Sequence, residues 1–83
     1  MEILFSNNSK KQLIRLNPRI QQKIIYTLEK FKNNQRVDII KLKSKDEEFR
    51  IRTGNYRIQL EKVNGDFLVT NVGKREGFYL VFF

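Results

Sequence analysis

Three arginines near the middle of this 83-residue chain, Arg50, Arg52 and Arg57, are spaced so that they can hold one anion together. They alternate with apolar residues on both sides of Gly54-Asn55. This pattern is typical of a β-hairpin with a two-residue turn, because Gly and Asn tolerate the positive φ that such turns require. A turn at this pair places Arg52 opposite Arg57. Like charges in that position destabilise a strand pair, so the arginine cluster indicates a functional role. The simplest role is anion binding, because arginine's planar donor fork suits a phosphodiester.

The same register predicts that the other face of the hairpin is apolar. Its cross-strand pairs are Thr53 with Tyr56, Ile51 with Ile58, and Phe49 with Leu60. The alternative interpretation is that the three arginines only form a solvent-exposed face of the sheet. Composition alone supports this alternative, because charged side chains most often lie at the surface.

Composition narrows both the partners and the chemistry. The net charge is +8 and the pI is about 10.1, which indicates a polyanionic partner: RNA, DNA, an acidic membrane surface or an acidic protein. Cysteine and histidine are both absent, which removes thiolate or imidazole metal sites and histidine-based triads. Asp46, Glu47 and Glu48 are interpreted as a loop, so we expect no metal and no cofactor. Any catalysis must then use Arg, Lys, Tyr, Asp or Glu.

The sequence also carries an expectation about location. No apolar run approaches the roughly 20 residues that a membrane span needs. The first five residues lack the basic region and long apolar region of a signal peptide. A cytoplasmic protein without membrane contact is expected.

Helices and strands can be placed from caps, turns and periodicity. A short strand over residues 1–5 is followed by capping residues at 6–9, which open a helix to about Leu16. Asn17-Pro18 starts a second helix, ending near Asn33-Asn34. Residues 39–43 are either a strand or a loop. After the hairpin, Asn64-Gly65 forms a second turn, and a last strand spans residues 67–72.

This order predicts one α+β domain spanning residues 1–83. A short N-terminal strand precedes an antiparallel helical hairpin that packs on one face of an antiparallel β-meander. The opposite face is expected to be open and positive. The expected core is Ile20, Ile24, Leu28, Phe31, Ile51, Ile58, Leu60, Phe67 and Val69.

Three blocks together, over nearly the whole chain, resemble the RelE toxins of the RelE/ParE toxin–antitoxin superfamily. They are Lys41-Leu42-Lys43, the hairpin over residues 49–58, and Val72-Gly73-Lys74-Arg75-Glu76-Gly77-Phe78-Tyr79. The resemblance implies a RelE-like fold and a metal-independent ribonuclease that cuts mRNA in the ribosomal A site. There the 2′-hydroxyl attacks the adjacent phosphate and leaves a 2′,3′-cyclic phosphate. The implied partners are the ribosome, mRNA and an acidic antitoxin.

The resemblance also carries roles over to individual positions. Arg50 and Arg52 match basic residues of the first hairpin strand and would hold the phosphate and the leaving group. Arg57 and Arg75 would clamp the scissile phosphate, and Tyr79 would stack on a base or orient the 2′-hydroxyl. The RNA-binding candidates are Lys41, Lys43, Lys45 and Lys74. The last of these stands where many relatives have a histidine.

Alternatives remain at this point. A ParE-like toxin that inhibits gyrase shares the fold and much of the hairpin motif, and a basic nucleic-acid-binding protein without enzymatic activity would explain the charge. Tyr79 is also consistent with a core position. The apolar end, including Phe78, Phe82 and Phe83, either completes the core as an edge strand or forms a patch that an antitoxin covers.

Overall fold

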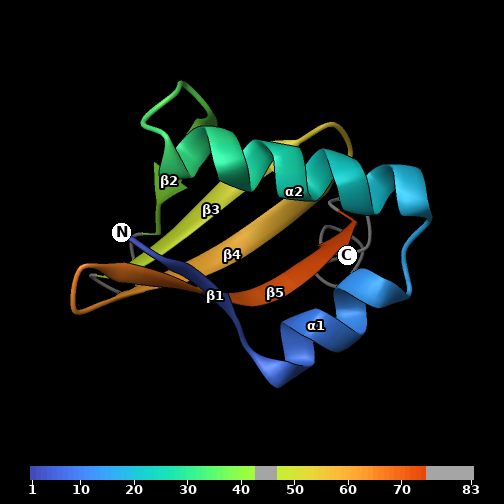
Figure 1. The fold of residues 1–83 in the computed structure, drawn as a ribbon, viewed down its shortest axis with the longest axis horizontal. Helices are drawn as coiled ribbons and strands as arrows, with labels where there is room; N and C mark the ends of the chain where they lie inside the picture. Colours follow the sequence, from blue (N-terminus) through green and yellow to red (C-terminus); the bar gives the residue numbers. More distant parts are fainter. Residues whose placement is uncertain (43–46, 75–83) are drawn as a thin grey trace, which may run out of the picture.

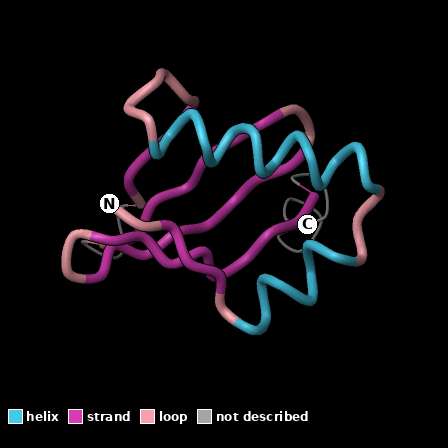
Figure 2. Tube along the Cα trace, viewed as in Figure 1, coloured by secondary structure: helices cyan, strands magenta, loops and turns pink. Residues whose placement is uncertain are grey.

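The computed structural model describes residues 1–42 and 47–74, which form two helices and a five-stranded sheet (Figures 1 and 2). In chain order these are β1 (Ile3–Phe5), α1 (Asn7–Ile14), α2 (Pro18–Lys32), β2 (Asp38–Lys41), β3 (Glu48–Thr53), β4 (Tyr56–Val63) and β5 (Asp66–Lys74). Residues 39–43 were predicted as either a strand or a loop, and most of this segment belongs to strand β2. Glu48, which was expected in a loop, begins β3.

Both helices begin where their capping residues predict, and α2 ends before Asn33 as expected, whereas α1 ends at Ile14, two residues before the predicted end. The hydroxyl of Ser6 accepts a hydrogen bond from the Ser9 backbone N–H at 3.1 Å, which caps α1. Asn17 caps α2 by accepting from the Arg19 N–H at 2.8 Å, with Pro18 as the first helical residue. The two helices run in opposite directions, as expected (Figure 2). Ile14, the last residue of α1, is 71% exposed and does not join the core.

The sheet has the order β1-β5-β4-β3-β2. The β3–β4 hairpin has the expected register, with Arg52 opposite Arg57 and Ile51 opposite Ile58. Only Gly54 of its turn has a positive φ, +59°, which is the pattern of a type II′ turn rather than one with two left-handed residues. The second turn does have two such residues: Asn64 with φ of 52° and Gly65 with φ of 86°.

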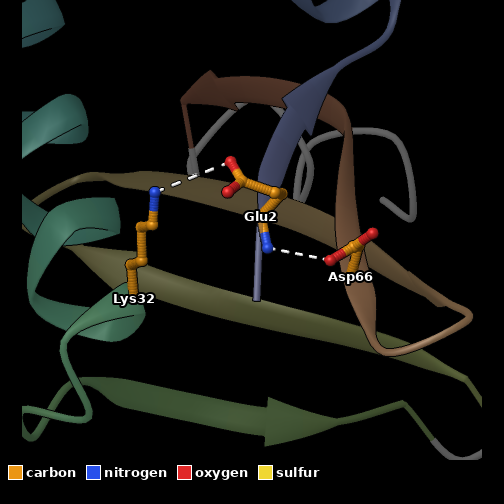
Figure 3. Close-up of polar contacts among 3 residues, drawn as sticks. All are labelled: Glu2, Lys32 and Asp66. Atoms are coloured by element: carbon orange, nitrogen blue, oxygen red, sulfur yellow. Dashed lines mark hydrogen bonds and ion pairs between the residues drawn. The ribbon is translucent and has the colours of Figure 1, made fainter.

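Strand β1 makes the sheet mixed, because it pairs in parallel with β5 beside the antiparallel meander of β2 to β5. Figure 3 shows two contacts that hold its start. The Glu2 backbone N–H donates to Asp66 Oδ1 at 2.8 Å, and Glu2 Oε2 lies 3.6 Å from Lys32 Nζ of α2. Strand β1 therefore ties the start of β5 to the end of α2.

The core lies between the helices and one face of the sheet, and α2 crosses that face (Figure 1). Its buried members are Ile24, Leu28, Ile51, Ile58, Leu60, Val69 and Val72, with Ile20, Phe31 and Phe67 packed against them. Every expected core residue is therefore in the core or packed on it. No helix within residues 1–42 and 47–74 is long and apolar enough to cross a membrane.

Candidate functional site: an arginine face on the sheet

The face of the sheet opposite α2 carries the three arginines of the hairpin. Arg52 pairs with Arg57 across the β3–β4 ladder, and Arg50 pairs with Gln59 two residues further along. Successive side chains of a strand point to opposite faces, so the buried Ile51 and Ile58 place the arginines on the other side. All three arginines are half-buried. We call these three residues the arginine face.

Strand β2 adds one acidic group to the arginine face. Asp38 pairs with Arg52 in the register, and its Oδ2 accepts a hydrogen bond from Arg52 Nε at 3.0 Å. A hollow of about 440 Å³ lies at the β2 edge, and its lining includes Arg52, Asp38, Arg36 and Lys30. The carboxylate offsets part of the repulsion between Arg52 and Arg57 and holds the Arg52 guanidinium toward this edge.

Arg57 opens onto a different, smaller hollow of about 180 Å³ next to α1. Gln59 and Asn71 line it beside Arg57, and Gln12 of α1 and Gly73 complete its wall. Gln59 and Asn71 are directly opposite each other in the β4–β5 register, as are Arg57 and Gly73. Arg52 and Arg57 thus share a face of the sheet while bordering separate hollows.

Carboxamide side chains were not among the site residues expected from the sequence. Gln12 lies four residues after Asn8 on α1, so both occupy one side of that helix. Their amides reach Asn71 of β5, at 3.2 Å in each case. The four-residue spacing of Asn8 and Gln12 predicts that the two amides share one side of the first helix. It does not indicate which strand they contact.

The two predicted lysine contacts among the described residues, Lys41 and Lys74, are not on the arginine face. Lys41 pairs with Phe49, and Lys74 pairs with Tyr56, both at register positions that alternate with the arginines. Lys74 does line the hollow beside Arg57. The other site predictions, Lys43, Lys45, Arg75 and Tyr79, lie outside the described residues, as does the apolar end over residues 78–83.

The described part of the site is suited to binding and neutralising an anion. Arginine is a poor proton acceptor because its guanidinium group holds its proton very tightly, so such a site acts by positioning and by stabilising negative charge. Among residues 1–42 and 47–74 no group of three or more Asp, Glu, His or Cys side chains could hold a metal ion.

The chain is similar in sequence and in structure to known proteins of one family. No protein-family model matches the chain. The curated toxin RelE3 of Methanocaldococcus jannaschii is 35% identical over 74 aligned residues, and the match covers 83% of this chain and 83% of that one. A chain of the solved RelB–RelE antitoxin–toxin complex from Methanococcus jannaschii has a TM-score of 0.80 and 30% identity, and the match covers 95% of this chain and 98% of that one.

Two more distant structures support the fold alone. A chain of the RelBE2 toxin–antitoxin complex of Mycobacterium tuberculosis has a TM-score of 0.73 at 20% identity, covering 89% of this chain and 96% of that one. A chain of the RelE–RelB complex of Pyrococcus horikoshii OT3 has a TM-score of 0.73 at 16% identity, with 89% and 93% covered.

The mixed sheet, its arginine face and these likenesses define the class of protein, a toxin of the toxin–antitoxin type. The resemblance drawn from the three sequence blocks is confirmed. The chain belongs to the RelE family of toxins.

Proposed function

We propose that this chain is a ribosome-dependent mRNA endonuclease, acting in the cytoplasm as the toxin of a toxin–antitoxin pair. The observation that carries the proposal is the arginine face, where Arg52 and Arg57 stand directly opposite each other and Arg50 lies two residues from Arg52 on the same strand. This arrangement costs the sheet stability, and an RNA phosphate placed over it would offset the repulsion.

The reaction proposed is an internal displacement on one phosphodiester. The ribose 2′-oxygen forms a bond to phosphorus and gives up its proton. The bond from phosphorus to the 5′-oxygen breaks, and that oxygen takes a proton to become a 5′-hydroxyl. The products are a 2′,3′-cyclic phosphate and a 5′-hydroxyl end. The arginines stabilise the extra negative charge that develops on the phosphate oxygens in the transition state.

Within this proposal the arginines keep the roles expected from the sequence. Arg57, with Arg75, clamps the scissile phosphate, while Arg50 and Arg52 hold it and the leaving group. Tyr79 stacks on a base or orients the 2′-hydroxyl. The structure adds Asp38 as the residue that positions Arg52 through its Nε.

Primer extension on a message in a translating extract tests the proposal. Wild type is expected to produce discrete cuts within codons, and Arg57→Ala to lower the cutting rate by about 10²–10³, the effect of removing one group that stabilises developing charge. Arg75→Ala is expected to act in the same direction. Arg19→Ala is the matched control, because it removes one positive charge from an exposed position at the start of α2.

The result that would overturn the proposal is equal cutting by Arg57→Ala and Arg19→Ala. An uncut message together with a block of gyrase would instead favour the gyrase-inhibiting alternative.

We also propose that a cognate acidic antitoxin binds this chain. The net charge of +8 suits an acidic partner, and the solved structures whose fold this chain shares are complexes with antitoxins. If a small acidic protein is encoded beside this one, its co-expression is expected to suppress toxicity and to yield a complex by size exclusion. Continued toxicity and separate elution would contradict the partnership.

A further inference from the structure

Among residues 1–42 and 47–74, no strand pairs with the second half of β5 on the side where β1 ends. Strand β1 pairs with β5 only as far as Val69, whose carbonyl accepts from the Ser6 N–H at 3.0 Å. Beyond that point α1 lies beside β5 (Figure 1). Its carboxamides take the place of a strand: Asn8 Nδ2 donates to the Thr70 carbonyl at 3.4 Å, and Gln12 Oε1 accepts from the Val72 N–H at 2.7 Å.

The same two amides orient the side chain of Asn71. Its Oδ1 accepts hydrogen bonds from Asn8 Nδ2 and from Gln12 Nε2, both at 3.2 Å. The carboxamide oxygen is therefore held toward α1. Because oxygen and nitrogen of a planar carboxamide diverge from one carbon, Nδ2 is turned away from the helix. Within the part of the chain that the structure describes, this NH₂ group donates no hydrogen bond.

The oriented amide lines the hollow beside Arg57. Gln59, opposite Asn71, supplies a second carboxamide, and Gly73, opposite Arg57, adds no side chain to the wall of the hollow. Among the residues that the structure describes, no atom lies within 4 Å of a Cβ built at Gly73. At about 180 Å³ the hollow is smaller than the roughly 300 Å³ at which drug-sized ligand sites begin, so it suits a single ring system.

We propose that this hollow binds one nucleobase of the RNA, next to the phosphate held by Arg57. The inference rests on the proposed ribonuclease function and names a specificity subsite within it. Carboxamides offer both donors and acceptors, which is what the edge of an unstacked base requires, whereas a phosphate accepts only. Asn71 is a base-contacting residue, and Asn8 and Gln12 are positioning residues that act through it.

Asn71→Asp is the variant that isolates the proposed contact. An aspartate keeps an acceptor oxygen for both α1 amides and removes only the outward NH₂ donor. It also adds a negative charge near Arg57, which weakens RNA binding whatever the base. Removing the base from the RNA separates these two effects, because the charge acts on every RNA and the lost donor acts only where its base is present.

The measurement is binding of a short single-stranded RNA by fluorescence anisotropy. One 2′-deoxy sugar at the cut site prevents cleavage, and a series of the same RNA lacks one base at each position in turn. On the full RNA, Asn71→Asp is expected to weaken binding about tenfold more than it does on one member of the abasic series. Gly73→Val, which adds a branched side chain to the wall of the hollow, is expected to show the same dependence on the same base.

An equal loss on every RNA of the series would overturn the inference, as would failure of wild type to bind any of them. The proposed function is read separately, from cutting of a message in the translating extract. Cutting by wild type without a base-dependent loss would remove the base subsite and leave the nuclease. Absence of both binding and cutting would remove both proposals.

Discussion

The direct opposition of Arg52 and Arg57 predicts a measurable repulsion within the folded state. The two residues are partners in the β3–β4 register, and such partners have Cβ atoms about 4.5–5.5 Å apart. Two unit charges about 6 Å apart in a water-like dielectric repel by about 0.7 kcal/mol. That figure lies within the roughly 0.2–1 kcal/mol found for cross-strand pairs.

Single substitutions do not isolate this repulsion, because each arginine has other contacts. Arg52→Gln also removes the 3.0 Å contact with Asp38, an ion pair between side chains that are 38% and 53% exposed and worth about 0.2–1 kcal/mol. A double-mutant cycle cancels such terms. We expect Arg57→Gln to be more favourable by about 0.7 kcal/mol in the wild-type background than in the Arg52→Gln background.

The assay is thermal and urea denaturation of the four proteins at low salt and at about 1 M salt. A coupling of this size corresponds to a difference of roughly 3–5 °C between the two midpoint shifts for a domain of this length. It is expected to vanish at high salt, where the screening length is about 3 Å. A coupling of zero or of opposite sign at low salt, or one that salt does not change, would refute the reasoning.

Three further substitutions test the fold by denaturation against wild type. Gly54→Ala is expected to cost at least about 1–2 kcal/mol, because Gly54 has φ of +59° and a Cβ there would lie 2.8 Å from Lys23 Nζ; a neutral result would contradict the turn. Ser9→Ala should cost about 1 kcal/mol, since the fully buried Ser9 hydroxyl donates to the Val69 carbonyl at 2.8 Å, and no loss would argue against that bond. Ile58→Ala should cost about 2–5 kcal/mol by leaving a cavity at a fully buried position, and a loss below about 1 kcal/mol would place Ile58 outside the core.

The hairpin and the core could be predicted from the sequence because their signals are local and mutually consistent. Alternation with a period of two assigns each residue to a face, and a two-residue turn then leaves one register. The second helix could also be predicted, because Asn17 and Pro18 mark its start and its apolar residues recur at helical spacing. These elements are the ones the structure reproduces in detail.

The parts that could not be predicted depend on pairing between distant segments. Nothing local in residues 3–5 indicates a parallel partner more than sixty residues later. The Asp38–Arg52 contact required β2 to be a strand in one particular register. Lys41 was expected on the path to the phosphate, and only that register shows that it alternates with the arginine face.

The carboxamide cluster could not be predicted for a different reason. Asn8, Gln12 and Asn71 are common surface residues, and their types do not indicate chemistry. They matter because β1 is short, so that α1 rather than a strand covers the second half of β5. The length of one edge strand therefore decides which polar side chains border the arginine face.

The most direct test of the central claim is the single-turnover rate of message cutting on programmed ribosomes by Arg57→Lys. Lysine keeps the positive charge and loses the planar two-donor fork, so a site that grips the scissile phosphate through that fork should slow at least about tenfold. Arg19→Lys, at an exposed position, should leave the rate unchanged. Equal rates for Arg57→Lys and wild type would contradict the assignment of the arginine face to the phosphate.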